Sequence, residues 1–276
     1  MNSIYSFPPG KILVPTDMGA ASKAALQYAR YFHNGFGSAV LILHSHHLDL
    51  PPYFSSGQLA ALKRELKKLA KAAEEYVGQD SEPILGFRAE IRVTENTPVE
   101  AILETSQEPG IDLIIMGMHG HRGAERLFLG SVTERVLRRS ALPVLAVHHP
   151  PSEAPIRNIL CPMTPSETGK QALEYAAAIG KTLKARLTVL HVVEPGAEPL
   201  DCPLVEEPIK NSCRVEEVRF HGNAAKTIIE ASNDLKPDLT VMGAEHKPGV
   251  LGEFFSSTTS SVMQMAVGPL MIVPRR

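Results

Sequence analysis

The stretch KILVPTDMGAASKAALQYA (residues 11–29) recurs in the chain as NILCPMTPSETGKQALEYA (158–176), at an offset of 147 residues. LILHS (41–45) and TVLHV (188–192) repeat at the same offset. In both copies a short apolar run leads into a segment whose apolar residues recur at helical spacing. The sequence therefore contains one structural unit twice.

The repeat continues to the far end of the unit. DLIIMG (112–117) returns as DLTVMG (238–243), and LPVLAV (142–147) returns as GPLMIV (268–273), both at an offset of 126 residues. The difference between the offsets, 147 minus 126, indicates a net deletion of 21 residues in the second copy. It falls between about 193 and 214, where the repeat is lost.

Each copy alternates short apolar runs with amphipathic segments. The runs are rich in Val, Ile and Leu, as is typical of strands buried on both faces. Strands separated by helices predict right-handed βαβ crossovers and a parallel, doubly wound sheet. The fold class is therefore α/β, with five strands in each copy. In the first copy the predicted strands are KILVP (11–15), AVLILH (39–44), AEIRV (89–93), DLIIMG (112–117) and PVLAV (143–147).

The deletion removes one helix from the second copy. In the first copy, leucines at helical spacing predict a helix over 59–77 with a lysine-rich solvated face. The second copy has EPGAEPLDCPLVEEP (194–208) there, which Pro and Gly make unsuitable for a helix. The proline-rich stretch 148–158 predicts a linker, so the expected domains are 1–149 and 155–276.

Composition limits the partners and the compartment. A 43% hydrophobic chain of 276 residues supports a substantial core, and a net charge of −2 argues against nucleic-acid or membrane binding. No secretory signal or apolar run of roughly 18 residues is present, which predicts a cytoplasmic protein. Three cysteines without CxxC spacing indicate free thiols, and Cys161, inside a strand, reads as a small buried hydrophobe. The histidine pairs lack partners at zinc-ligand spacing.

A glycine-containing loop follows the fourth predicted strand, in GMHGHRGAERLFLGSVTERVLRRS (117–140). Ligands of open parallel sheets bind at the carboxyl ends of strands, where glycines permit positive φ and close approach of the backbone. Gly130 and Ser131 then begin a helix, whose N-terminal N–H groups favour an anion. These features predict a phosphate-bearing ligand. A purely structural alternative stays open, in which Gly117 ends a strand and Ser131 and Glu134 form a capping box.

The pattern Gly117-x2-Gly120-x9-Gly130-Ser131 resembles the G-x2-G-x9-G-[S/T] signature of the universal stress protein family. ILVPTD (12–17) is similar to that family's first strand, which ends in the Asp of its nucleotide site. The resemblance covers nearly all of both copies. It implies two tandem Rossmann-like domains of strand order 3-2-1-4-5 that form an intramolecular pseudo-dimer through their fifth strands. It also implies an ATP site, with or without Mg²⁺, between the first and fourth strands.

Carried over position by position, the resemblance assigns roles around the nucleotide. Residues after the first strand would line adenine and ribose, Ser45 would meet adenine through its backbone, and residues 130–132 would hold the β and γ phosphates. For Asp17 the alternative is a cap for the following helix. The implied site comprises Pro15, Thr16, Asp17, Ser45, Met116, Gly117, His119, Gly120, Gly130, Ser131 and Val132.

The second copy departs from this pattern. Thr164 replaces the Asp, and TPSE (164–167) predicts a self-sufficient helix start capped by Thr164. Gly243 is kept, but His246 and Ser256 replace the other two glycines and add side chains where a phosphate would lie. We expect the second copy to have lost nucleotide binding. SSTTSS (256–261) reads as a helix cap in preference to a phosphoryl acceptor.

Three functions are compatible with the sequence. The leading hypothesis is a regulatory ATP-binding stress protein with one competent site, an unidentified protein partner, and the option of further homodimerisation. The second is slow ATP hydrolysis or autophosphorylation, although no motif places a general base beside the γ-phosphate. The third is a nucleotide-independent scaffold of the same fold.

Overall fold

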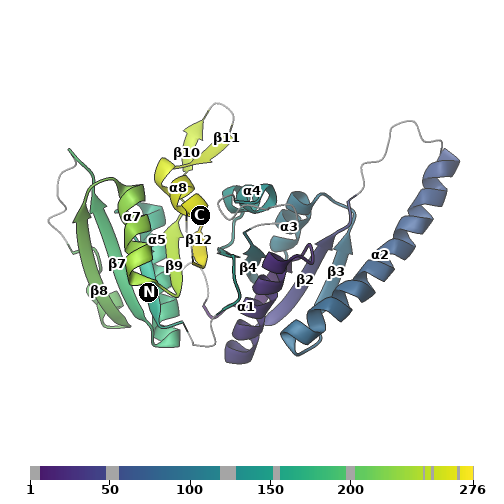
Figure 1. Cartoon of the computed structure of the whole chain (residues 1–276), viewed down its shortest axis with the longest axis horizontal. Coiled ribbons are helices and arrows are strands. Elements are labelled where there is room, and N and C mark those ends of the chain that lie inside the picture. The colour runs from purple at the N-terminus through teal and green to yellow at the C-terminus, as the bar shows by residue number, and fades with distance from the viewer. Residues whose placement is uncertain are drawn as a thin grey trace.

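The computed structural model describes residues 7–47, 56–118, 129–151, 156–196, 203–244, 246–249, 252–265 and 268–275. Ten of the strands in these residues form one sheet in the order β3-β2-β1-β4-β5-β12-β9-β6-β7-β8, and β10 pairs with β11 in a separate hairpin. Figure 1 shows the two halves of the molecule side by side, with the hairpin standing beyond the sheet next to α8. The first half comprises β1 to β5, and the second half β6 to β12, each with its helices.

The strands of the first half follow its five predicted apolar runs closely, whereas the second half has seven strands, two more than expected, because of the β10–β11 hairpin. Those of the first half are β1 (Lys11–Pro15), β2 (Ala39–Ser45), β3 (Glu90–Thr94), β4 (Ile111–Gly117) and β5 (Val144–Val147). Those of the second half are β6 (Asn158–Pro162), β7 (Arg186–Val193), β8 (Arg214–His221), β9 (Leu239–Gly243), β10 (His246–Gly249), β11 (Gly252–Phe255) and β12 (Leu270–Val273). Along β1, Ile12 and Val14 enter one core and Leu13 enters the other, because successive side chains point to opposite faces.

Helices cover both faces of the sheet. The first half contains α1 (Ala20–Phe36), α2 (Ser56–Leu85), α3 (Pro98–Ser106) and α4 (Ser131–Arg139). The second half contains α5 (Glu167–Leu183), α6 (Glu207–Lys210), α7 (Ala224–Leu235) and α8 (Ser257–Met265). One core is built on the face of α1, α2, α5 and α6, and the other on the face of α3, α4, α7 and α8. Each core includes residues of both halves, so the chain packs as one α/β sandwich.

The two halves join through their fifth strands. β5 and β12 pair antiparallel, with Leu145 opposite Met271 and both side chains fully buried, whereas the other neighbours in the large sheet pair parallel. The first half has the order 3-2-1-4-5, and β8-β7-β6-β9-β12 is the same order in the second half. The expected pseudo-dimer is confirmed, and the pairing leaves neither fifth strand as an open edge.

The halves differ most at the second helix. α2 extends the helix predicted over 59–77 to 30 residues; its Leu66 is buried, whereas Leu69 is 50% exposed. In the second half the corresponding region holds the four-residue α6, and Leu204, Val205 and Ile209 supply buried side chains to the core. Residues 152–155 of the predicted linker lie outside the described part, and the exact domain limits stay predictions. No helix among the described residues is long and apolar enough to span a bilayer.

Candidate functional site

The carboxyl ends of β1 and β4 lie side by side where the strand order reverses direction. β1 pairs with β2 on one side and with β4 on the other, and the chain continues from β1 into α1. Open parallel sheets bind ligands at such a point. α1 and α4 both begin at this edge, since each starts within a loop that leaves one of these two strands. The predicted site residues of the described chain lie on these segments, together with Ser45 at the end of β2.

Asp17 is fixed in the turn between β1 and α1. Its Oδ1 accepts hydrogen bonds from the Gly19 N–H at 2.9 Å and the Ser22 hydroxyl at 2.6 Å, and Ser22 Oγ in turn accepts from the Asp17 N–H at 3.2 Å. Met18 takes a left-handed backbone with φ of 64° to complete the turn. The N-cap of α1 is Gly19, which offers no side-chain cap bond. Asp17 thus orders the turn without being the N-cap, which was the structural alternative for this residue.

Gly117 is required by packing between α1 and β4. A Cβ at this position would lie 2.6 Å from the Ala21 Cβ and 2.7 Å from the Ala21 carbonyl carbon, a distance that real contacts do not reach. Its φ lies outside the left-handed region, so the expectation that Gly117 supplies positive φ is wrong. The Gly117 carbonyl accepts a hydrogen bond from Thr133 Oγ1 at 2.8 Å, which holds the first turn of α4 against the end of β4.

Gly130 is the N-cap of α4. Its backbone is extended, with φ of −62° and ψ of 140°, and the N-cap position provides no side-chain hydrogen bond to the first turn. The capping-box alternative for Ser131 and Glu134 is therefore wrong, and Glu134 pairs instead with Arg138 at 2.7 Å. The Gly130 N–H donates to the Met118 carbonyl at 2.7 Å and closes the loop at its base. His119 and Gly120 lie outside the described residues.

The end of β2 is tied to its neighbours by two side chains. Ser45 Oγ donates to the Asn96 carbonyl at 2.6 Å, which leaves the predicted backbone contact with adenine as an untested role. His44 Nδ1 lies 2.9 Å from the Thr16 carbonyl, and in the second half His191 Nδ1 lies 3.0 Å from the Met163 carbonyl. These histidines hold the loop that leaves the first strand of each half. Sequence reasoning missed them, although both occupy the same position of the repeat.

Two of the three arginines of α4, Arg138 and Arg139, are paired with carboxylates. Arg138 contacts Glu134, and Arg139 donates two hydrogen bonds to the Glu100 carboxylate at 2.7 and 3.2 Å. The Arg139 guanidinium lowers the pKa of Glu100, and Glu100 raises the pKa of Arg139, through their hydrogen bond and opposite charge. Both side chains point to solvent, so the pair contributes little stability. The two helix starts contribute positive potential at this edge through their N–H groups and dipoles.

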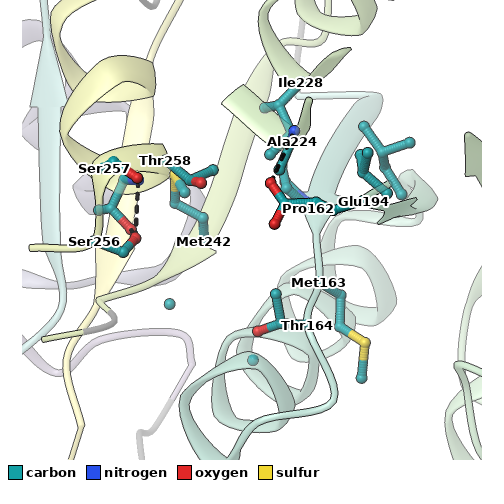
Figure 2. Close-up of a pocket in the computed structure, with 15 residues that line it drawn as sticks. Pro162, Met163, Thr164, Glu194, Ala224, Ile228, Met242, Ser256, Ser257 and Thr258 are labelled. Atoms are coloured by element: carbon teal, nitrogen blue, oxygen red, sulfur yellow. Dashed lines mark hydrogen bonds between the residues drawn. The ribbon is translucent and has the colours of Figure 1, made fainter. Parts of the chain in front are cut away.

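The second half contains a cavity of about 280 Å³ at the equivalent edge, which Figure 2 shows in close-up. All nine described residues of the predicted first-half set have their repeat counterparts in its lining. In order from Pro15 to Val132, those counterparts are Pro162, Met163, Thr164, Val192, Met242, Gly243, Ser256, Ser257 and Thr258. In the second half, the repeat counterparts of the predicted site residues therefore surround a single cavity. The sequence comparison did not predict that this space stays open in the second half.

Of the helix starts beside the second-half cavity, those of α5 and α8 are capped by serine. Ser166, not Thr164, is the N-cap of α5, and its Oγ accepts the Gly169 N–H at 3.1 Å, so the prediction of a Thr164 cap is wrong. Ser256 Oγ accepts the Thr259 N–H at 3.2 Å, which confirms the capping role predicted for the start of the hydroxyl run. Gly243 repeats the packing role of Gly117, since a Cβ there would lie 2.6 Å from the Thr168 carbonyl oxygen.

Comparison with known proteins agrees with this architecture. The sequence model of the universal stress protein family matches residues 9–148, 155–210 and 200–274. Universal stress protein MJ0531 of Methanocaldococcus jannaschii is 33% identical over 152 residues, which make up 52% of this chain and 84% of that protein. Universal stress protein Rv2005c of Mycobacterium tuberculosis is 25% identical over 227 residues, 73% of each chain.

A solved structure covers nearly the whole molecule. The crystal structure of a universal stress protein from Archaeoglobus fulgidus superposes with a TM-score of 0.77 at 25% identity, and the match covers 98% of this chain and 100% of that chain. The sheet order, the repeated helices and the antiparallel junction thus belong to a fold already observed in a complete chain. This protein belongs to the universal stress protein family and contains two copies of the family's domain in tandem.

Proposed function

We propose that the first half binds an adenine nucleotide, ATP, at the carboxyl ends of β1 and β4. The observation that carries the proposal is the pair of helix starts there. α1 and α4 both begin with a glycine N-cap, and neither first turn receives a cap bond from its N-cap side chain. The free N–H groups and the helix dipoles favour phosphate oxygens.

The turn that holds Asp17 supports the ribose end of the same site. A carboxylate accepts hydrogen bonds from sugar hydroxyls, and Asp17 is kept in one orientation by the Gly19 N–H and the Ser22 hydroxyl. A fixed acceptor loses little entropy when the sugar binds. The family signature at Gly117, Gly120 and Gly130 points to the same ligand.

We assign the protein a regulatory role in the stress response, in which nucleotide occupancy of the first half changes the surface offered to a protein partner. Binding, not turnover, is the expected activity, because the signature brings no general base to the γ-phosphate. Mg²⁺ would accompany the phosphates as a charge-neutralising ion.

Isothermal titration of the full chain with ATP, with and without Mg²⁺, tests the proposal. Gly130→Val should weaken binding at least about tenfold, because its branched side chain fills the helix start. The fold should survive, since φ of −62° and ψ of 140° suit a β-branched residue. Ser256→Val is the matched control at the same repeat position, and it should leave ATP affinity unchanged.

Three outcomes would contradict the proposal. No heat with the wild-type chain, together with no nucleotide in the purified protein, would favour the scaffold hypothesis. An equal loss of affinity in both variants would contradict a single first-half site. Phosphate release well above that of Gly130→Val would identify an ATPase instead of a binding protein.

A further inference from the structure

The second-half cavity has an apolar floor and a polar rim. Met163, Leu190, Ile228 and Met242 are each no more than 6% exposed and form the floor. Thr164 and Ser257 are exposed at the rim (Figure 2). At about 280 Å³ the cavity lies just below the range of roughly 300 to 1,000 Å³ for ligand pockets. A floor of this kind suits a flat apolar ring, and a hydroxyl rim suits a polar substituent.

Glu194 gives this cavity the opposite charge from a phosphate site. Among the described lining residues it is the one charged side chain, and its Oε1 accepts the Ala224 N–H at 3.4 Å, as Figure 2 shows. The same repeat position in the first half is His47, a residue able to carry positive charge. A carboxylate at the rim attracts hydrogen-bond donors and repels a phosphate dianion.

The helix starts around the cavity offer few donors to an anion. Ser166 Oγ accepts the Gly169 N–H at 3.1 Å, Ser256 Oγ accepts the Thr259 N–H at 3.2 Å, and Asn223 Oδ1 accepts the Lys226 N–H at 3.0 Å. A side-chain cap thus consumes an N–H at the start of α5, α8 and α7 alike. The space that would receive phosphates in the first half is bounded here by Ser256 and Ser257.

We propose that the second-half cavity binds a phosphate-free, nucleoside-sized molecule with a flat heterocycle that carries amino or hydroxyl donors. The ring lies on the methionine floor, and its donors face Glu194 and the rim hydroxyls. The inference rests on the proposed function in one respect: the expected size of the ligand, a base and a sugar, is taken from the nucleotide proposed for the first half. The two repeated domains would then bind different ligands at equivalent positions, a phosphate-bearing one in the first half and a phosphate-free one in the second.

Methionine methyl NMR can detect ligand binding at the first-half and second-half sites in one sample. Met116 and Met242 occupy the same repeat position, one in each half, and Met163 adds a second probe in the second-half cavity. The full chain is labelled at the methionine ε-methyl groups, and these three signals are assigned with single Met→Leu variants. Adenosine and AMP are the matched probes, because they differ by one phosphate.

Adenosine should shift the Met163 and Met242 signals to saturation, with AMP binding there at least about tenfold more weakly. Glu194→Gln keeps an acceptor for the Ala224 N–H but removes the negative charge. It should reduce the ratio of the AMP and adenosine dissociation constants to about threefold or less. Ile228→Trp fills the floor of the cavity and should abolish the adenosine-induced shifts of Met163 and Met242. If that variant does not fold, the affinity ratio measured with Glu194→Gln still tests the inference.

Two results would overturn the inference: AMP shifting Met163 and Met242 as readily as adenosine, or adenosine leaving both unchanged at millimolar concentration. The response of Met116 to ATP reports separately on the proposed first-half site. Failure of that response alone would leave the second-half result intact, so the two hypotheses are distinguished.

Discussion

The two halves share a backbone plan but begin their helices differently at the ligand edge. In the first half, Gly19 and Gly130 are the N-caps of α1 and α4, and neither makes a side-chain cap bond. In the second half, Ser166 and Ser256 occupy the same positions and cap α5 and α8. A serine hydroxyl satisfies an N–H within the protein, whereas glycine leaves it for water or a ligand. This difference is the basis for proposing a phosphate site in the first half alone.

The turn after the first strand shows a coupled change. In the first half Met18 has φ of 64°, and Asp17 is held by Ser22. The residue at the position of Met18 in the second half is Pro165, whose ring fixes φ near −65°, so the same turn cannot form. The Thr164 carbonyl instead approaches Gly169, the counterpart of Ser22, where a Cβ would lie 2.1 Å from its oxygen. The differences at these three repeat positions, Asp17/Thr164, Met18/Pro165 and Ser22/Gly169, are therefore structurally coupled.

The largest effect should come from the feature that the halves share. Gly117→Ala and Gly243→Ala each place a Cβ against the backbone of the adjacent helix, at 2.7 and 2.6 Å. Overpacking at such a contact should lower the free energy of unfolding by about 3 kcal/mol in each case. Urea unfolding measures it, with Gly35→Ala as control, since nothing lies within 4 Å of a Cβ there and alanine favours α1. Equal stability of the three variants would contradict a shared packing role.

Gly169→Ser should cost about 2 kcal/mol, because the added Cβ must displace the Thr164 carbonyl, which lies in an exposed turn that can yield. The triple variant Thr164→Asp, Pro165→Met and Gly169→Ser restores the first-half turn and should recover at least half of that loss. Urea unfolding of the single and triple variants measures the coupling. Strict additivity of the three changes would show that the turns differ for another reason.

The central strands could be predicted from sequence because each is a short run rich in Val, Ile and Leu that is buried on both faces, whereas the polar β8 and the β10–β11 hairpin carry no such run. KILVP coincides with β1, and the pairing of β5 with β12 was implied by the family resemblance. The start of α5 could not be predicted in the same way. TPSE offers both Thr164 and Ser166 as caps, and the approach of Thr164 to Gly169, a contact between backbone and backbone, selects Ser166.

Other features of the candidate site depend on distances between elements. The packing requirement at Gly117 could not be predicted from sequence, because it depends on the position of Ala21 in α1. The second-half cavity depends on how three strands and three helices pack, so it could not be predicted from the residues of the second copy alone. The repeated pair His44 and His191 did carry a sequence signal, because a polar residue kept in a buried strand of both copies indicates a structural partner.

An exchange of the N-caps of α4 and α8 should move ligand affinity more than stability. Gly130→Ser provides the cap that α8 already has, so it should weaken ATP binding about tenfold while it stabilises the fold by a few tenths of a kcal/mol. Ser256→Gly should cost a few tenths of a kcal/mol and leave ATP affinity unchanged. Isothermal titration and urea unfolding of both variants provide the measurements. Unchanged ATP affinity in Gly130→Ser would contradict the role assigned to the uncapped helix start.

The smallest effect is expected where the halves differ inside the core. Cys161 in β6 replaces Val14 of β1; both side chains are fully buried, and burial raises the pKa of the Cys161 thiol to about 12. Cys161→Val should therefore change stability by less than about 1 kcal/mol at pH 7.

The folded thiol stays protonated, whereas the unfolded thiol ionises near pH 9, so the wild type loses stability as pH rises above that value. At pH 9.5 the wild type should have lost about 1 kcal/mol more than the variant. Parallel urea unfolding at the two pH values measures the difference, and identical pH profiles would show that the thiol ionises without unfolding.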